Sequence, residues 1–168
     1  LNVFRPADSV ETAEAWELAL KNSGPSVLAL SRQELSSIRE EKSSVNLTKK
    51  GGYIIKDTNG KRDVTLLASG SEVEVAIKTS ELLFKENINA AVISLPCWEL
   101  FEIQTSSYKK EVLGEVIKIG IEAASEMGWH KYICSEGIFI GMKSFGASAP
   151  ASKLFKHFGF DPSDIKEI

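Results

Sequence analysis

The sequence contains little cysteine and little histidine, with two residues of each among 168. Cys97 and Cys134 stand far apart without any partner spacing, which excludes a disulfide framework and a cysteine-based zinc site. His130 and His157 lack the i,i+4 spacing with which one helix face ligates a metal. We therefore expect neither a metal site nor a disulfide scaffold.

The chain also lacks a strong charge of either sign. Its 20 basic and 23 acidic residues leave a formal net charge of −3, which gives no broad positive field. No apolar run approaches the ~18 residues that a membrane-spanning helix requires. We expect neither nucleic acid nor a membrane as a partner, and we expect a cytoplasmic location.

The remaining composition is that of an ordinary globular protein. The hydrophobic fraction is 43% and the charged fraction is 26%, which suits one domain with an appended piece. Both ends look cut, because the residues after Leu1 read as the end of a strand and residues 161–168 start a helix without finishing it. We expect the sequence to be a fragment of a larger protein.

The first forty residues predict a strand, a helix and a strand. Residues 2–4 are a short extended run that a proline closes. Asp8 and Glu11 have the spacing of a capping box at the start of a helix. Residues 26–31 are continuously apolar, which is typical of a strand buried on both faces. We interpret this N-terminal strand–helix–strand piece as a remnant, and we expect it to be partly disordered or covered by self-association.

Residues 39–52 are polar and show no apolar periodicity, so we interpret them as a linker in which Lys49 and Lys50 are solvated. Beyond this linker, strand and helix patterns alternate, beginning with a hairpin-like turn at residues 57–60 between two short strands. Such alternation predicts an α/β fold with a mainly parallel sheet flanked by helices. The predicted strands are residues 53–55, 64–68, 90–95, 116–121 and 137–141, and the predicted helices start near residues 71, 98, 108 and 151.

Arg32 is the strongest candidate for binding on position alone. Ligands of open parallel sheets bind beyond the carboxyl ends of the strands, and Arg32 directly follows an apolar strand. Its planar, permanently charged guanidinium suits a phosphate group. An ion pair with a nearby carboxylate explains the same residue equally well, and position alone does not separate the two.

Weaker candidates lie at other strand ends. Gly70 and Ser71 resemble the start of a phosphate-binding turn, although Ser71 with Glu74 also has capping-box spacing, which explains the pair better. Cys97 would need a base or a helix dipole to form a thiolate, so a buried, inert cysteine is favoured. Glu122 ends a strand and is weak support for acid–base chemistry.

Two further features are interpreted as structural. Trp98 and Trp129 are expected to fill space between helices and sheet, or to face a partner. The segment from Gly141 to Pro150 carries one charge, at Lys143, and is expected to be a packed turn rather than a solvated loop. Neither feature predicts chemistry.

Several blocks of sequence, in order, resemble the transketolase family and cover essentially the whole chain. Each block is weak alone, and their combination is specific. The blocks are Phe4-Arg5-Pro6-Ala7-Asp8, Ser31-Arg32-Gln33, Gly51-Gly52-Tyr53, Ala68-Ser69-Gly70-Ser71-Glu72-Val73-Glu74, Pro96-Cys97-Trp98-Glu99-Leu100-Phe101, Gly141-Met142, Phe145-Gly146-Ala147-Ser148-Ala149-Pro150 and His157-Phe158-Gly159.

The resemblance implies a thiamine-diphosphate enzyme of the pentose phosphate pathway, which moves a two-carbon ketol unit from a ketose phosphate to an aldose phosphate. Residues 1–50 would be the tail of the pyrimidine-binding domain and a linker, and residues 51–168 the C-terminal domain. The arginine that Arg32 matches contacts the sugar phosphate. Family members are homodimers with active sites between the diphosphate-binding domain of one subunit and the pyrimidine-binding domain of the other.

The departures from the family are as informative as the matches. The Gly-Asp-Gly that starts the family's diphosphate and metal motif is absent, as are the glutamate that activates the cofactor and the histidines that handle the sugar. The intact enzyme would use thiamine diphosphate with Mg²⁺ or Ca²⁺. We expect this chain to bind neither group, to contain no catalytic residue and to be inactive. The reason is that cofactor chemistry depends on protein groups that position the reactive atom, and those groups are the ones missing here.

Three other functions are compatible with the sequence. One is an independent anion- or nucleotide-binding regulatory domain that uses the Gly70–Ser71 turn. A second is a related thiamine-diphosphate ketol or acyl transferase, against which Ser31-Arg32-Gln33 argues. A third is a thiol enzyme that uses Cys97.

Overall fold

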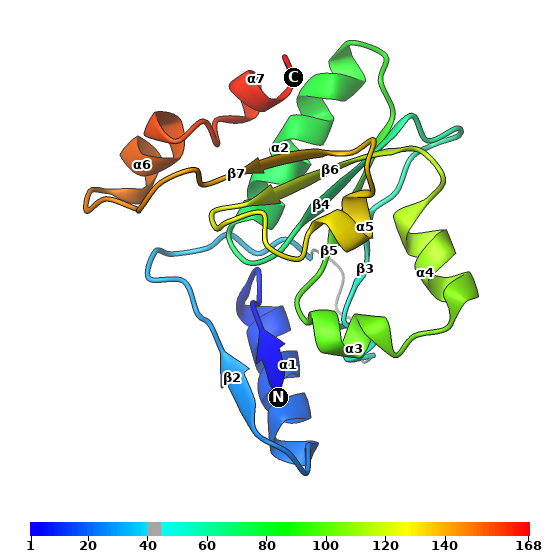
Figure 1. Cartoon of the computed structure of the whole chain (residues 1–168), viewed down its shortest axis with the longest axis vertical. Coiled ribbons are helices and arrows are strands. Elements are labelled where there is room, and N and C mark those ends of the chain that lie inside the picture. Colours follow the sequence, from blue (N-terminus) through cyan, green and yellow to red (C-terminus); the bar gives the residue numbers. More distant parts are fainter. Residues whose placement is uncertain (40–44) are drawn as a thin grey trace.

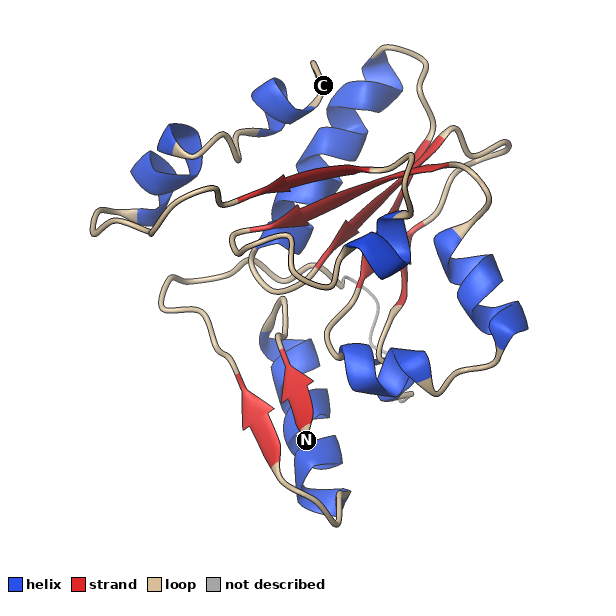
Figure 2. Ribbon diagram, in the orientation of Figure 1, coloured by secondary structure: helices blue, strands red, loops and turns tan. Residues whose placement is uncertain are grey.

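The computed structural model describes residues 1–39 and 45–168 and arranges them in two packed parts. Residues 1–39, here called the arm, lie below a helix-covered sheet formed by residues 53–168 (Figures 1 and 2). The two parts meet at the carboxyl ends of the central strands, and this junction positions the candidate site.

The arm is a small parallel strand–helix–strand unit. Strands β1 (Asn2–Phe4) and β2 (Ser26–Leu28) pair in parallel, and helix α1 (Ser9–Lys21) connects them. The predicted cap is confirmed, because the Glu11 amide donates to Asp8 Oδ1 at 2.8 Å. The prediction that β2 is buried on both faces is wrong: β1 is its one partner in the described chain, and Val27 is 45% exposed.

The sheet is mainly parallel, as the sequence predicts. Its strand order is β3-β5-β4-β6-β7, in which β5, β4, β6 and β7 run parallel and β3 is antiparallel to β5. Nearly continuous apolar sequence accounts for the centre, where every residue of β4 and β5 is buried. The strands are β3 (Tyr53–Lys56), β4 (Val64–Ala68), β5 (Ala90–Ser94), β6 (Ile117–Glu122) and β7 (Ile138–Gly141).

The predicted hairpin between β3 and β4 does not form. Tyr53 of β3 pairs with Ser94 of β5, and β5 separates β3 from β4. The fully buried β4 takes the centre of the sheet, where parallel β5 and β6 cover both its edges. The turn at residues 57–60 therefore serves as a loop that leads from the edge of the sheet to its middle.

Two hydrophobic cores lie on opposite faces of the sheet. Successive side chains of a strand alternate between faces, so Leu66 packs in the core under α2 while Leu67 packs in the core under α3, α4 and α5. The helices are α2 (Glu72–Lys85), α3 (Trp98–Glu102), α4 (Ser106–Leu113), α5 (His130–Ile133), α6 (Ala151–His157) and α7 (Pro162–Ile165). None of the helices in residues 1–39 and 45–168 is long and apolar enough to cross a membrane.

The predicted linker is more ordered at its end than its polar sequence indicates. Residues 40–44 lie outside the described part of the chain. Residues Thr48–Lys50 form a 3₁₀ turn, labelled η1. Thr48 is fully buried, and its amide and hydroxyl donate to Glu14 Oε2 on α1 at 3.0 and 2.8 Å. This segment therefore packs against the arm instead of spanning freely between the two parts.

Candidate functional site

The carboxyl ends of β4 and β6 form the position at which open parallel sheets bind ligands. From β4 the chain moves to β5 on one side, and it later returns to place β6 on the other side of β4. The loops that follow β4 and β6 therefore diverge and leave a crevice between them. In this chain the arm lies at this end of the strands (Figure 1), and its residues Arg5 and Pro6 line the crevice.

Arg5 of the arm lines this crevice, together with Gly70 and Glu122. Its guanidinium donates to Glu122 Oε1, the end of β6, at 2.5 Å, and Ser69, just after β4, donates to the other carboxylate oxygen at 2.5 Å. The backbone of Arg5 adds two contacts: its amide donates to the Pro96 carbonyl at 2.8 Å, and its carbonyl accepts from the Gly70 amide at 3.0 Å. One arm residue thus binds the loops after β4, β5 and β6.

The crevice carries more negative than positive groups. Burial raises the pKa of Glu122, although Arg5 and Ser69 oppose that effect. Burial also raises the pKa of Glu72, at the start of α2, to about 7, and the charge of Glu122 adds to this rise. Arg5 thus faces two buried carboxyl groups, and the crevice offers no surplus positive charge to a phosphate.

The Gly70–Ser71 turn is engaged by the protein itself. The Gly70 amide donates to the arm, as described above, and the Ser71 hydroxyl donates to Glu72 Oε1 at 2.6 Å. The prediction that Ser71 caps α2 through its side chain is therefore wrong, because its hydroxyl is turned to the adjacent carboxylate. This geometry argues against an anion site at the turn.

Arg32 lies elsewhere, at the rim of a separate hollow of about 490 Å³. Gln33, Leu154 and residues 147–151 line the same hollow. Within the described part of the chain, the Arg32 side chain has no hydrogen bond or ion pair, so the structure brings no carboxylate to it. Its guanidinium is therefore open to a phosphate, which it can bind through two parallel N–H groups.

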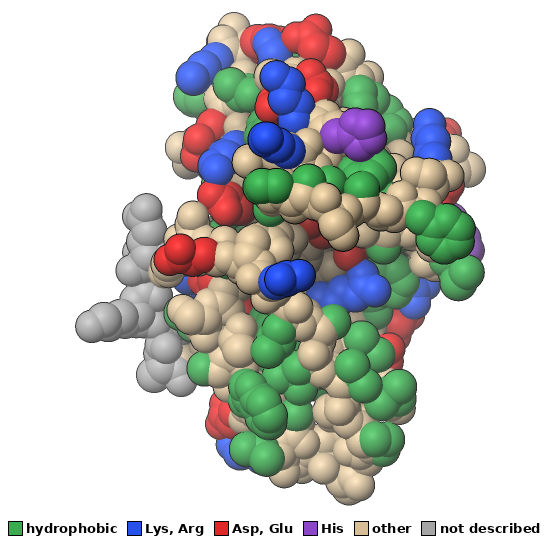
Figure 3. Space-filling model, turned by 90° about the vertical axis from the view of Figure 1, so that its left-hand side faces the viewer, with side chains coloured by type: hydrophobic (Ala, Val, Ile, Leu, Met, Phe, Trp, Pro, Cys, Tyr) green, Lys and Arg blue, Asp and Glu red, His purple; other side chains and the backbone are tan. Residues whose placement is uncertain are grey.

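The loop that borders this hollow is exposed over residues 143–150, so the expected packed turn is wrong. Phe145, at its tip, is 98% exposed. The loop leaves the end of β7 beyond the sheet, where no described helix covers it (Figure 1). Figure 3 views this side and shows hydrophobic side chains gathered at the bottom of the molecule, where the arm lies. The exposed apolar residues of the arm include Trp16, Val27 and Leu30.

The structure supports the inert interpretation of Cys97. The thiol is buried, donates to Glu99 Oε2 at 3.4 Å, and has its pKa raised to about 12, chiefly by burial. Both histidines are exposed. Trp129 is buried and Trp98 is half-buried, and both pack in the core under α3, α4 and α5, as expected.

Sequence reasoning missed the buried carboxyl group that joins the arm to the sheet. Glu11 accepts hydrogen bonds from Tyr53 Oη and Ser94 Oγ, each at 2.6 Å, and from the Ala7 amide at 2.7 Å. Burial raises its pKa, and the three donors offset part of that rise. The capping-box pattern marked Glu11 as a local cap, and nothing in the local sequence pointed to its long-range partners.

The described residues do not form a site for a divalent cation. Among residues 1–39 and 45–168, no three His, Cys, Asp or Glu side chains cluster as metal ligands. The sequence also lacks the Gly-Asp-Gly motif noted above. The residues that the structure describes therefore do not fit a metal–diphosphate group.

Comparison with protein families gives one match over most of the chain. Residues 51–161 match the model described as the transketolase-like TK C-terminal domain. A transketolase from Sinorhizobium medicae is 52% identical over 167 residues, which are 98% of this chain and 24% of that protein. A transketolase from Cereibacter sphaeroides is 50% identical over 166 residues, with 98% and 25% covered. The chain thus spans about a quarter of the length of these relatives.

Solved structures agree with the sequence comparison. A transketolase from Pichia stipitis, crystallised with sedoheptulose 7-phosphate, is 38% identical and superposes with a TM-score of 0.89. The alignment covers 99% of this chain and 24% of that chain. A mainly parallel sheet flanked by helices is therefore the fold that these C-terminal regions share.

Proposed function

Because this chain belongs to the transketolase family, we propose that it is the C-terminal quarter of an enzyme that transfers a two-carbon ketol unit from a ketose phosphate to an aldose phosphate. The names of its relatives support the reaction class. Transketolases from Pichia stipitis were crystallised with fructose 6-phosphate, xylulose 5-phosphate and sedoheptulose 7-phosphate, which supports phosphorylated sugars as substrates. In that enzyme, residues 1–50 complete the pyrimidine-binding domain and residues 51–168 are the C-terminal domain.

Arg32 is the residue proposed to bind the phosphate of the sugar. The observation that carries this proposal is the open guanidinium at the rim of the hollow of about 490 Å³, without a carboxylate partner in the described chain. Arginine binds phosphate through paired, charge-assisted hydrogen bonds. The group acts by holding the substrate and takes no part in bond breaking.

Thiamine diphosphate and its divalent cation are proposed to bind other parts of the intact enzyme. Thiamine diphosphate supplies the carbanion chemistry of ketol transfer when bound. Nothing among the described residues of this chain fits the metal, so we propose that the chain alone is inactive. Its contribution is the Arg32 contact and a packed domain at a homodimer interface.

The proposed location is the cytoplasm, on the basis of an unremarkable composition and two unpaired cysteines. A relative from Solanum tuberosum is named as chloroplastic, so location varies within the family. The exposed apolar residues of the arm support its packing against further chain of the intact enzyme.

An Arg32→Gln variant of the intact enzyme tests the phosphate contact. Charge-assisted hydrogen bonds contribute about 1.5–3 kcal/mol, so KM for ribose 5-phosphate should rise about 10- to 150-fold. With unphosphorylated ribose as acceptor, kcat/KM should stay unchanged. Lys143→Gln, on the exposed loop but outside the lining of the hollow, is the matched control. An equal loss with both acceptors would refute the assignment.

A further inference from the structure

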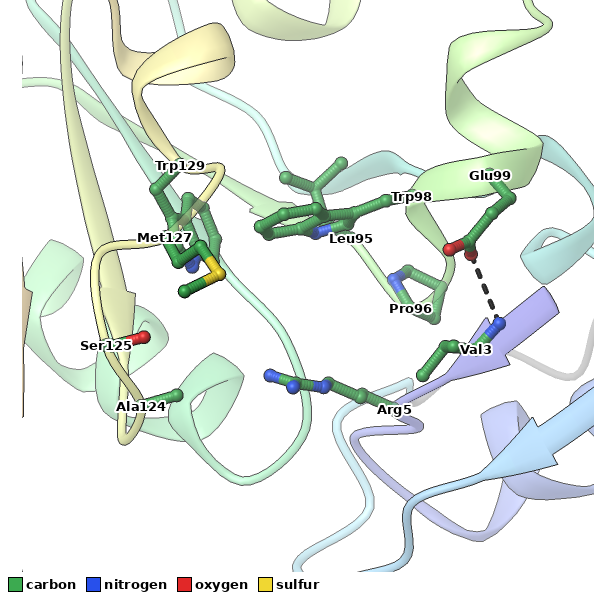
Figure 4. Close-up of a pocket in the computed structure, with 10 residues that line it drawn as sticks. All are labelled: Val3, Arg5, Leu95, Pro96, Trp98, Glu99, Ala124, Ser125, Met127 and Trp129. Atoms are coloured by element: carbon green, nitrogen blue, oxygen red, sulfur yellow. Dashed lines mark hydrogen bonds between the residues drawn. The ribbon is translucent and has the colours of Figure 1, made fainter. Parts of the chain in front are cut away.

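A second hollow, separate from the one that Arg32 lines, lies beside Arg5 at the junction between the arm and the sheet. It has a volume of about 300 Å³ and opens between the arm and the loops that follow β5 and β6 (Figure 4). The arm contributes Val3 and Arg5, and the first turn of α3 contributes Trp98 and Glu99. Neither the hollow of Arg32 nor the proposed ketol transfer uses this cleft.

The walls of the cleft are aromatic and rigid. Trp98 and Trp129 pack edge to face, with ring centroids 5.2 Å apart and planes at 89°. Trp129 is 1% exposed. The backbone of Gly128 packs closely against Trp98, so that a Cβ atom on Gly128 would lie 2.8 Å from the indole ring. The two indoles are therefore held in place before any ligand arrives, which lowers the cost of binding.

The polar groups that face the cleft are mainly hydrogen-bond donors. Figure 4 shows the indole nitrogens of Trp98 and Trp129 turned toward the side on which the Arg5 guanidinium lies. Within residues 1–39 and 45–168 neither indole N–H has an acceptor, and Arg5 donates from its side chain to Glu122 alone. The cleft thus presents donors that await acceptor atoms.

The carboxylates around the cleft outnumber its arginine, because Glu122 pairs with Arg5 and Glu99 lines the same cleft. The positive charge of Arg5 is matched by Glu122 on one side, with an N–O distance of 2.5 Å. Glu99 lies on the opposite rim. Burial raises the pKa of Glu99, but hydrogen bonds outweigh burial and lower the pKa overall, and the largest of these comes from the Val3 amide at 3.1 Å. A phosphate or carboxylate ligand would meet these carboxylates, so an uncharged ligand is favoured.

We propose that this cleft binds an uncharged, planar heterocycle of one or two rings that carries carbonyl or ring-nitrogen acceptors. Its flat faces and edges suit the two indoles, and its acceptors suit the unpaired N–H groups. The volume of about 300 Å³ is at the small end of ligand pockets, which restricts the ligand to that size.

Caffeine is a suitable probe, because it is neutral, planar and carries two ring carbonyls. The chain holds three tryptophans, and the indole N–H signals in a ¹H–¹⁵N correlation spectrum report on each separately. Saturable shifts of Trp98 and Trp129, with Trp16 unchanged, are expected, at a dissociation constant of about 1 mM for a ligand of this size. Trp16 is 51% exposed on α1 and serves as the control for unspecific stacking.

A pair of adjacent variants completes the test. Ser125 lines the cleft and is exposed, so Ser125→Phe should fill it and weaken caffeine binding at least tenfold without disturbing the core. Glu126→Phe, next in sequence, exposed and outside the lining, should leave binding unchanged. AMP, which is anionic, should shift neither cleft tryptophan at 5 to 10 times the caffeine concentration needed for half-saturation.

Three results would overturn the proposal. Linear, unsaturated shifts led by Trp16 would mean unspecific stacking. Absence of any shift of Trp98 and Trp129 would mean that the cleft does not bind this class. Equal binding by the Ser125→Phe variant would place the site elsewhere. None of these results bears on ketol transfer or on Arg32, so the two proposals fail separately.

Discussion

Glu72 makes the stability of the chain depend on pH near neutrality. The side chain is buried at the start of α2, where it accepts from the Ser71 hydroxyl and faces Glu122 and Arg5. Burial, and then the charge of Glu122, raise its pKa from 4.5 to about 7. A raised pKa means that the folded state binds the proton more tightly than the unfolded state. The resulting stabilisation is complete below pH 4.5 and is lost as pH rises through about 7.

The size of this effect follows from the shift. A pKa change from 4.5 to about 7 corresponds to about 3 kcal/mol over the whole titration. Most of the shift comes from burial, which the open solvent does not screen. Between pH 6 and pH 8, the linkage relation gives a loss of about 1.3 kcal/mol in the free energy of unfolding from this group.

Urea unfolding at pH 6 and pH 8 measures the loss directly. Glu72→Gln keeps the shape of the side chain and removes its titration, so the variant should lose about 1.3 kcal/mol less than the unsubstituted chain. Glu74→Gln, also in the first turn of α2, is the control for the general effect of removing a negative charge from the start of this helix. Contributions from groups other than the substituted carboxylates are common to the three proteins and cancel in the comparison. An identical loss in the chain and in Glu72→Gln would refute the reasoning.

Three further predictions concern packing and reactivity. Glu11→Ala should lower the free energy of unfolding by about 3 kcal/mol, because three donors lose their acceptor. Tyr53→Phe removes one of these donors and should lower it by about 1 kcal/mol. Equal losses in urea unfolding would contradict the network. Gly51→Ala should lower the thermal midpoint sharply, since φ is +74° and the new Cβ would lie 2.0 Å from the backbone of α3; an unchanged midpoint would contradict this packing. Maleimide at pH 7.5 should label the exposed Cys134 and spare Cys97, and labelling of both in the folded chain would contradict the burial of Cys97.

The centre of the sheet could be predicted from sequence because its residues leave few options. Strands β4 and β5 are apolar at nearly every position, and such strands must be covered on both faces. The partner of β3 could not be predicted in the same way, because the turn at residues 57–60 is a local signal and strand order is a property of the whole sheet. The hairpin expectation failed for that reason.

The phosphate contact of Arg32 stays a prediction, and its sequence signal is a cation after an apolar run at residues 26–31. In the structure β2 ends at Leu28, so Arg32 lies beyond the strand in a loop.

Arg5 and Ser69 look ordinary in sequence, and Glu122 is a lone carboxylate at a strand end. The three meet because the arm packs against the ends of β4 and β6, which their spacing in sequence does not reveal. Glu11 reaches Ser94 across the same junction, and local pattern could not reveal that pairing.

Ketol transfer by the native polypeptide that carries these residues is the most direct test of the account. That polypeptide, isolated from its source cells and supplied with thiamine diphosphate and Mg²⁺, should convert xylulose 5-phosphate and ribose 5-phosphate, while the 168-residue chain under the same conditions should not. Absence of transfer by the native polypeptide, or turnover by the chain alone, would contradict the central claim.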